Sequence, residues 1–256
     1  MIKAVFFDID GTLLSNKNNK VPESTKLALD LLKQNGIKRF IATGRHFLEI
    51  EGLDIADIDF DGYILLTGQL VFDGARNVIY SRPIHKADSE VLIKHFNDKD
   101  IPIMMVEKDR LYINYVNQNV KDAQYALKVE VPNIESYHGD LIYQASVFAS
   151  KTTEKALLSE MGSSKSTRWN DYGIDIIDAE GGKRHGIHKI LEHFIISEEE
   201  TMAFGDGEND IDMLQTAKIA VAMGNAIDDL KKHADYITDN LEDDGIYNAL
   251  KHFNLI

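Results

Sequence analysis

The stretch Asp8-Ile9-Asp10-Gly11-Thr12-Leu13-Leu14 directly follows the apolar run Ala4-Val5-Phe6-Phe7. A short apolar run that opens a domain predicts a buried strand, and open parallel sheets bind ligands outside the carboxyl ends of their strands. Because strand side chains alternate, we expect Asp8 and Asp10 on the same side of the chain. Two such charges repel by about 4 kcal/mol at close range and an effective dielectric constant of 20. The pair therefore predicts a site that holds a cation, or a proton on one carboxyl group; a plain Asp-Gly turn is the alternative.

The composition narrows the possible functions. The chain has 256 residues, a net charge of −14 and no cysteine. An acidic protein disfavours nucleic acid as a partner, because that binding depends on Lys and Arg. Without cysteine there is no disulfide, thiol nucleophile or thiolate metal site. The first apolar run is too short for a secretory or membrane-spanning segment, so we expect a cytoplasmic protein with no membrane partner.

Strand and helix patterns alternate near both ends of the chain, over residues 22–68 and again over 187–237. This rhythm predicts an α/β fold, a Rossmann-like parallel sheet with crossover helices. The middle differs, because residues 101–106 and 111–116 have the pattern of a β-hairpin. It therefore reads as a second domain inserted into the first.

The domain boundaries follow from hinge signals on either side of the middle region. Arg82-Pro83 and Glu180-Gly181-Gly182 are the candidate hinges. We expect a core of residues 1–82 and 181–256, and an inserted α/β domain of residues 83–180.

Polar clusters fall at four predicted strand or helix ends: Asp8/Asp10/Thr12, Thr43-Gly44-Arg45, Lys183 and Gly205-Asp206-Gly207-Glu208-Asn209-Asp210. Hydrolysis of phosphate monoesters needs up to ~10²¹-fold acceleration, and therefore a nucleophile, a proton donor and preorganised positive charge. One carboxylate of the first cluster would attack and form an acyl phosphate, and the second would protonate the leaving oxygen. Thr43 and Lys183 would hold phosphoryl oxygens, and Mg²⁺ would take oxygen ligands from Asp8, Asp10 and Asp206.

The chain resembles a haloacid dehalogenase superfamily phosphatase of the Cof type, with a large α/β (type IIB) cap. The matching motifs, in order, are Asp8–Leu13, Ile41–Arg45, Lys183 with Gly186-Ile187 and Leu191, and Gly205–Leu214. A gap of cap size separates the second motif from the third. The resemblance extends over essentially the whole chain.

The resemblance implies a role for each matching residue. Asp8 is implied as nucleophile and metal ligand, Asp10 as general acid and base with its main-chain carbonyl on Mg²⁺, and Asp206 as the third ligand. The other matching residues are implied in binding or orienting the phosphoryl group: Thr43, Gly44, Arg45, Lys183 and Asn209 bind it, and Asp210 orients its neighbours.

The implied function is Mg²⁺-dependent hydrolysis of a small soluble phosphate monoester through an aspartyl phosphate, with sugar phosphates favoured. A small phosphorylated metabolite is then the expected partner, while the oligomeric state has no signal in the sequence. Two rivals stay open. A sugar phosphomutase of the same superfamily would return the phosphoryl group to a sugar. A non-enzymatic ligand-binding regulator on this fold would be expected to have lost a motif residue, and none is lost.

Two departures from the family pattern bear on substrate choice and leave the reaction type unaffected. Thr67-Gly68-Gln69 stands where relatives usually carry Asn-Gly, and Arg184 stands where many have glycine after the lysine. We expect the cap to select the substrate. Polar or aromatic residues of 112–115 or 168–172 are the candidates for contact with it.

Overall fold

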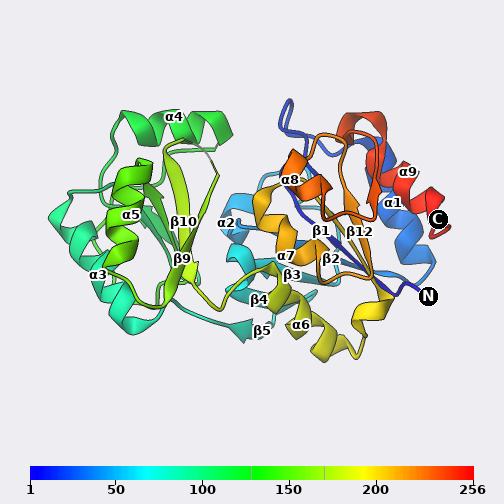
Figure 1. Cartoon of the computed structure of the whole chain (residues 1–256), viewed down its shortest axis with the longest axis horizontal. Helices are drawn as coiled ribbons and strands as arrows, with labels where there is room; N and C mark the ends of the chain where they lie inside the picture. The colour runs from blue at the N-terminus through cyan, green and yellow to red at the C-terminus, as the bar shows by residue number, and fades with distance from the viewer. Residues whose placement is uncertain (128, 170) are drawn as a thin grey trace. The chain divides into compact units, whose positions relative to one another are not determined.

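A computed structural model of the chain describes residues 1–127, 129–169 and 171–256. The chain divides into two units, each shown in Figure 1. Unit 1 consists of Met1–Ser81 and Gly182–Ile256, and unit 2 of Arg82–Gly181. Each boundary lies one residue from the expected one. Among the described residues, no helix combines the length and the apolar character needed to cross a membrane.

Unit 1 contains an eight-stranded sheet of order β13-β12-β11-β1-β2-β3-β4-β5. Its strands are β1 (Ala4–Phe7), β2 (Lys38–Ala42), β3 (Gly62–Leu65), β4 (Leu70–Asp73), β5 (Val78–Ser81), β11 (Thr201–Gly205), β12 (Ile219–Ala222) and β13 (Tyr236–Ile237). The six strands from β13 to β3 are parallel, and β1 lies between β11 and β2. The predicted α/β fold with a parallel core sheet is confirmed. The sheet continues beyond the expected third strand, because β4 and β5 add to it in antiparallel direction.

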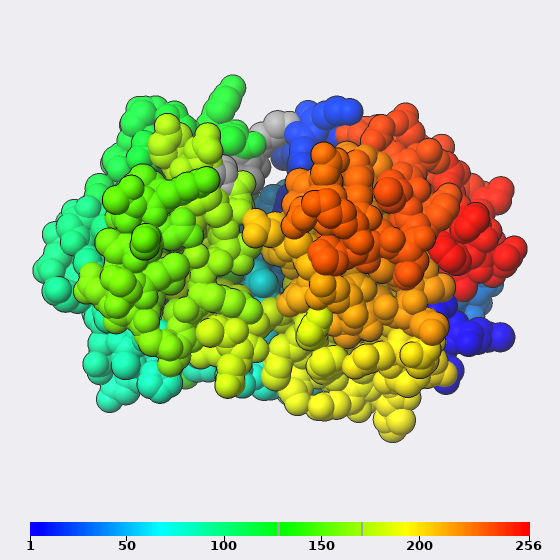
Figure 2. All heavy atoms as spheres, in the orientation of Figure 1, coloured from blue at the N-terminus to red at the C-terminus, as the bar shows by residue number. Residues whose placement is uncertain are grey.

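Helices cover both faces of this sheet: α1 (Glu23–Gln34), α2 (Phe47–Ile50), α6 (Lys183–Phe194), α7 (Ile211–Leu214), α8 (Asp228–Lys231) and α9 (Gly245–His252). Neighbouring residues of β2 show the two faces. The Phe40 ring packs against Phe194 of α6, whereas Arg39 donates to the Leu29 carbonyl of α1. In the view of Figure 2, much of the surface of unit 1 comes from residues after Gly182, coloured yellow to red.

The alternation of β1 aims Asp8 at the start of α6. Phe6 stacks on Phe40 with a centroid distance of 5.1 Å, so Phe6 faces α6. Asp8 lies two residues on and has the same direction. Gly186 lets α6 lie close to the sheet, since a Cβ there would be 2.3 Å from the Ile64 side chain. The sheet therefore brings Asp8 to the first turn of α6, where Lys183 begins the helix.

Unit 2 contains a five-stranded antiparallel sheet of order β7-β6-β8-β10-β9. Its elements are α3 (Lys86–Asp98), β6 (Ile103–Val106), β7 (Leu111–Ile113), α4 (Gln118–Leu127), β8 (Gln144–Phe148), α5 (Lys151–Ser159), β9 (Ser164–Arg168) and β10 (Gly173–Asp178). The predicted hairpin is confirmed as β6–β7. Leu92 and Phe96 of α3 and Leu157 of α5 share one core cluster with Met105 of the sheet.

Only some of the unit 2 residues that were expected to contact substrate are exposed enough to do so. Tyr112 is fully buried in the core cluster, and its hydroxyl donates to Glu107 Oε1 at 2.5 Å. It therefore serves packing, and the expectation is wrong for this residue. Tyr115 is partly exposed, and Asn170 of the second candidate stretch lies outside the described residues.

Candidate active site

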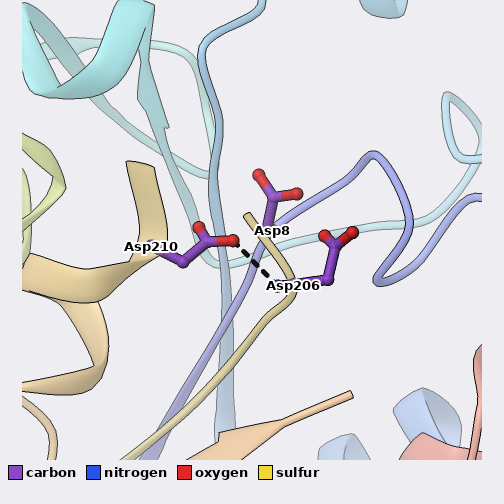
Figure 3. A group of neighbouring side chains, drawn as sticks. All are labelled: Asp8, Asp206 and Asp210. Carbon is purple, nitrogen blue, oxygen red and sulfur yellow. Dashed lines mark hydrogen bonds between the residues drawn. The ribbon is translucent and has the colours of Figure 1, made fainter. Parts of the chain in front are cut away.

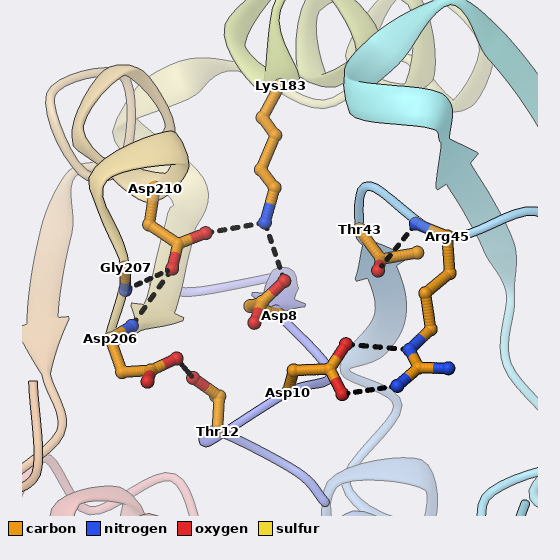
Figure 4. Close-up of polar contacts among 9 residues, drawn as sticks. All are labelled: Asp8, Asp10, Thr12, Thr43, Arg45, Lys183, Asp206, Gly207 and Asp210. Carbon is orange, nitrogen blue, oxygen red and sulfur yellow. Dashed lines mark hydrogen bonds and ion pairs between the residues drawn. The ribbon is translucent and has the colours of Figure 1, made fainter. Parts of the chain in front are cut away.

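Asp8 follows the last residue of the central strand β1 and is only 5% exposed. Its main-chain N–H donates to the Phe204 carbonyl of β11 at 3.1 Å, which fixes its backbone. Lys183 Nζ, itself 0% exposed, donates to Asp8 Oδ1 at 2.6 Å and to Asp210 Oδ1 at 2.5 Å (Figure 4). One buried ammonium thus joins carboxylates from two neighbouring strand ends.

The turn after β11 holds the second half of the site. Asp210 Oδ2 accepts from the main-chain N–H groups of Asp206 at 2.9 Å and Gly207 at 3.0 Å. Thr12 Oγ1 donates to Asp206 Oδ1 at 3.1 Å. Gly11 has φ +80°, and a Cβ there would lie 2.2 Å from Asp206 Oδ2, so only glycine fits. The loops after β1 and β11 therefore hold one another in place.

Three carboxylates form an oxygen-only cluster. Asp8, Asp206 and Asp210 each offer one oxygen, and these oxygens lie within 4.8 Å of one another (Figure 3). Burial raises the pKa of Asp8 well above its usual value, although Lys183 opposes the change. Burial, helped by the nearby Asp210, raises the pKa of Asp206 to about 7. Burial alone would lower the pKa of Lys183, but the negative charges of Asp210 and Asp8 have a larger effect and raise it.

The charges of this cluster suit a divalent cation. The cluster has three carboxylates, and one ammonium contacts two of them, which leaves a negative excess in a buried place. Carboxylate oxygens are the ligands of hard cations such as Mg²⁺ and Ca²⁺. The cluster contains two of the three predicted ligands, Asp8 and Asp206, and adds Asp210.

The Asp10 carboxylate, which was expected to bind Mg²⁺, is paired with Arg45. Both of its oxygens accept from the Arg45 guanidinium, from Nε and from Nη2, each at 2.7 Å. Its side chain therefore lies outside the carboxylate cluster. The role given to its main-chain carbonyl stays a prediction.

Thr43 and its neighbours occupy the end of β2. The Thr43 hydroxyl accepts from the Arg45 N–H at 3.1 Å, and its main-chain N–H donates to the Ile64 carbonyl at 2.9 Å. Gly44 lies between Thr43 and Arg45, and Asn209 lies half-buried on the turn that carries Asp210. The predicted residues thus all lie at the ends of β1, β2 and β11 or at the start of α6.

Some supporting residues had no assigned role in the sequence analysis. Asn225 Nδ2 donates to the Gly11 carbonyl at 2.8 Å and so holds the loop after β1. Thr12 was inside the first motif, and its spacing from Asp10 was the available signal. The segment Val221–Ala226, which contains Asn225, resembles a closing segment of the Cof-type phosphatases and was the available signal. The contact itself joins loops 214 residues apart, so local spacing does not predict it.

Comparison with known proteins places this site in a family. The profile of the haloacid dehalogenase-like hydrolases matches residues 5–250. A Bacillus subtilis (strain 168) protein provisionally named phosphatase YkrA is 31% identical over 258 residues, which is 99% of this chain and 98% of YkrA. A second protein of that strain, 5-amino-6-(5-phospho-D-ribitylamino)uracil phosphatase YcsE, is 25% identical over 258 residues, 99% of this chain and 96% of YcsE.

A solved structure extends the comparison to the fold. The HAD subclass IIB sugar phosphatase BT4131 has a TM-score of 0.90 and 37% sequence identity, over 99% of this chain and 100% of that chain. The family profile and these relatives all extend over nearly the whole chain, including the carboxylate cluster. This chain therefore belongs to the haloacid dehalogenase-like hydrolases and is a phosphatase of their Cof type.

Proposed function

We propose that this phosphatase hydrolyses small soluble phosphate monoesters, sugar phosphates above all, through an aspartyl phosphate on Asp8, with Mg²⁺ as its cofactor. The observation that carries the proposal is the Lys183 ammonium, 2.6 Å from Asp8 and 2.5 Å from Asp210 in a buried strand-end site. An ammonium held there without reorganisation can stabilise the charge of a transferring phosphoryl group.

Asp8 is the nucleophile in this proposal. Lys183 binds one oxygen of Asp8, and we assign the attack on phosphorus to the other. A P–O bond to Asp8 forms as the P–O bond to the alcohol breaks, and water later cleaves the acyl phosphate. The Thr43 hydroxyl accepts from Arg45, so its hydrogen can be donated to a phosphoryl oxygen.

Asp10 acts as acid and then as base. It must protonate the leaving alcohol oxygen and later take a proton from the attacking water. Both its oxygens are bound by Arg45, so this ion pair must open before Asp10 can reach the alcohol. A bound phosphoryl group competes for the guanidinium, because Arg binds phosphate and carboxylate with the same fork. Arg45 is therefore assigned to phosphate binding.

Asp8, Asp206 and the main-chain carbonyl of Asp10 are the proposed Mg²⁺ ligands, with Asp210 beside them. The cluster of carboxylate oxygens and the raised pKa values of Asp8 and Asp206 support a cation here. Bound Mg²⁺ supplies charge neutralisation and polarises a phosphoryl oxygen. Asp210 holds Lys183 and the turn of Asp206, which keeps the set aligned.

The substrate class is supported by the relatives. BT4131, a sugar phosphatase, is 37% identical, whereas YcsE, whose name gives a phosphoribityl substrate, is 25% identical. We therefore rank sugar phosphates first. Unit 2 is the proposed cap domain that selects among them, because the proposal assigns the strand-end residues to the phosphoryl group or to the metal.

The test is turnover of a panel of phosphate esters by the purified protein with Mg²⁺, with chelator, and with Ca²⁺. We expect hydrolysis of sugar phosphates with Mg²⁺, none with chelator, and little with Ca²⁺, whose looser coordination misaligns the reactants. Beryllium fluoride should add to the Asp8 carboxylate. Full activity in metal-free protein contradicts the cofactor, and transfer of phosphate to a second sugar would identify a mutase.

A further inference from the structure

Three consecutive residues after β3 have left-handed backbone conformations. In the turn Leu66–Gly68, φ is +50° for Leu66, +52° for Thr67 and +86° for Gly68. Side chains of L-residues disfavour this region, and a β-branched residue in it is a genuine outlier. Thr67 is also buried. Such strain persists only where surrounding contacts hold it, and it is commonest at functional sites.

One side of the turn holds the loop that contains Thr43. The Thr67 N–H donates to the Thr43 carbonyl at 2.9 Å, and the Leu66 N–H donates to the Arg45 carbonyl at 3.3 Å. Two carbonyl groups of the loop Thr43-Gly44-Arg45, those of Thr43 and Arg45, thus accept hydrogen bonds from this turn. The Thr43 N–H donates to the carbonyl of Ile64, a residue of β3 just before this turn, at 2.9 Å.

The other side of the turn rests against the start of α6. A Cβ on Gly68 would lie 2.1 Å from the Gly182 carbonyl oxygen and 2.8 Å from its carbonyl carbon. Gly182 directly precedes Lys183, the first residue of α6. The contact is backbone against backbone, so no side chain can move aside to relieve it.

We propose that the left-handed turn Leu66–Gly68 is a positioning element that sets the separation between the Thr43 hydroxyl and the Lys183 ammonium. This rests on the proposed function, which assigns both groups to the phosphoryl oxygens. Three residues must touch both segments and then return the chain to Leu70, which pairs with Leu65. Successive left-handed residues reverse the chain within that length, which accounts for the strain at Thr67.

The central variant is Gly68→Ala, and Gly36→Ala is its matched control. Both glycines have left-handed φ values, +86° and +72°, so alanine costs similar backbone strain at either position. Only at Gly68 does the added Cβ meet another segment, because nothing lies within 4 Å of a Cβ on Gly36. The pair separates a change of spacing from a loss of stability.

We expect Gly68→Ala to lower kcat/KM by about 100-fold, the scale of a misplacement near 1 Å. The dissociation constant of inorganic phosphate, measured by calorimetry with Mg²⁺ present, should rise about tenfold, because the Thr43 hydroxyl and the Lys183 ammonium would no longer have the spacing that fits one phosphoryl group. Gly36→Ala should lose similar stability yet keep wild-type kcat/KM and phosphate affinity. Equal kinetics of the two variants would overturn the proposal.

A second variant covers the case in which Gly68→Ala folds poorly. Thr67→Gly/Gly68→Ala removes the strain at residue 67, so the unfolding midpoint should recover while phosphate affinity stays low. Recovery of both quantities, or failure of both variants to fold, shows a folding role only and overturns the positioning role. Wild-type protein that binds phosphate but turns over no ester contradicts the proposed function alone. Wild-type protein that binds no phosphate overturns both.

Discussion

The buried carboxyl groups at the strand ends of unit 1 and two carboxyl groups that hold loops and strands in unit 2 have opposite pKa shifts. In unit 1, burial raises the pKa of Asp8 well above its usual value and that of Asp206 to about 7. In unit 2, burial would raise the pKa of Asp88, but hydrogen bonds from the Ser164 hydroxyl and two main-chain N–H groups lower it overall. Burial would likewise raise the pKa of Glu154, but the hydrogen bonds that this residue accepts from a serine and an arginine of β9 lower the pKa overall.

The difference separates chemistry from architecture. A carboxylate whose lone pairs are filled by local donors favours the folded state in its charged form. A buried carboxylate beside other carboxylates destabilises the folded state in its charged form. Such a group is typical of functional sites, where a bound cation or a phosphoryl group offsets the unfavourable charge. In unit 1, the buried carboxylates without enough local donors therefore lie at the strand ends. In unit 2, Asp88 and Glu154 accept hydrogen bonds that hold neighbouring loops and strands in place. Three matched pairs of substitutions test this contrast.

Asp8→Asn should have the largest effect on activity. The amide keeps the shape but removes the charge that we propose attacks phosphorus, so turnover should fall by roughly 10⁴-fold or more, as when a nucleophile is removed from a catalytic unit. The free energy of unfolding of the metal-free protein should not fall, because one of three crowded carboxylates is gone. Asp88→Asn is the control, with near wild-type turnover expected. Substantial turnover by Asp8→Asn would remove Asp8 from the nucleophile role.

Lys183→Met should have the largest effect on stability. It leaves Asp8 and Asp210 buried without their ammonium, and breaking a buried pair in this way costs about 3–5 kcal/mol. Chemical denaturation at neutral pH measures the loss. Adding Mg²⁺ should restore part of the lost stability if the proposed cation binds these same carboxylates.

Lys189→Met on the same helix is the matched control. Its pair with Glu192 is partly exposed, and such pairs contribute about 0–1 kcal/mol. A loss for Lys183→Met no larger than that of Lys189→Met would show that the strand-end carboxylates are already neutralised in another way.

The strand-end position of Asp8 could be predicted from sequence because it depends only on local pattern. An apolar run followed by two acids indicates a strand and its carboxyl end, whatever the rest of the chain does. The Asp10–Arg45 ion pair could not, since it depends on how two loops 35 residues apart meet. The double contact of Asp210 with Lys183 and with the N–H of Asp206 depends in the same way on α6 meeting the turn after β11.

Strand β9, which the sequence did not predict, shows the same limit. β9 reads Ser-Lys-Ser-Thr-Arg and has no apolar residue, so it has no hydrophobic periodicity to detect. It is a strand because it pairs with β10, and because Arg168 binds Glu154 of α5 at 2.6 Å. β4 and β5 did carry a signal, the Asp73-Gly74 pair between two apolar runs, which is typical of a hairpin turn.

Asp88→Asn should lower the free energy of unfolding at neutral pH by about 1–3 kcal/mol, because an amide nitrogen would face main-chain N–H groups that now donate to a carboxylate. The native pKa of Asp88 is lower than that of the unfolded chain. Its stabilisation is therefore complete above the unfolded pKa and disappears as pH falls through the native one. The difference between wild type and variant should vanish in acid, and faster hydrogen exchange at Gly162 and Ser163 should localise it. A difference that grows in acid would contradict the sign.

Gln69→Met should have the smallest effect, and its sign is the informative part. Gln69 is fully buried next to the turn Leu66–Gly68, and neither polar atom of its amide has a partner among the described residues. In unit 2 the buried amide of Asn114 is fully used, accepting from the Ile103 N–H and donating to the Ile101 carbonyl, among others. Replacing an unpartnered amide by an apolar group of similar shape should raise the free energy of unfolding by about 1 kcal/mol.

Asn114→Leu is the opposite case, because it leaves a main-chain N–H and carbonyl groups buried without partners, and it should be destabilising by about 2 kcal/mol or more. Denaturation of the two variants side by side measures both signs. A loss of stability in Gln69→Met would mean that the amide is satisfied in solution by an ordered water. Unmatched polarity at the strand ends of unit 1 would then be confined to the carboxylates. A gain in stability with a fall in kcat/KM would instead place Gln69 with Asp8 and Asp206, among groups whose partner arrives with the substrate.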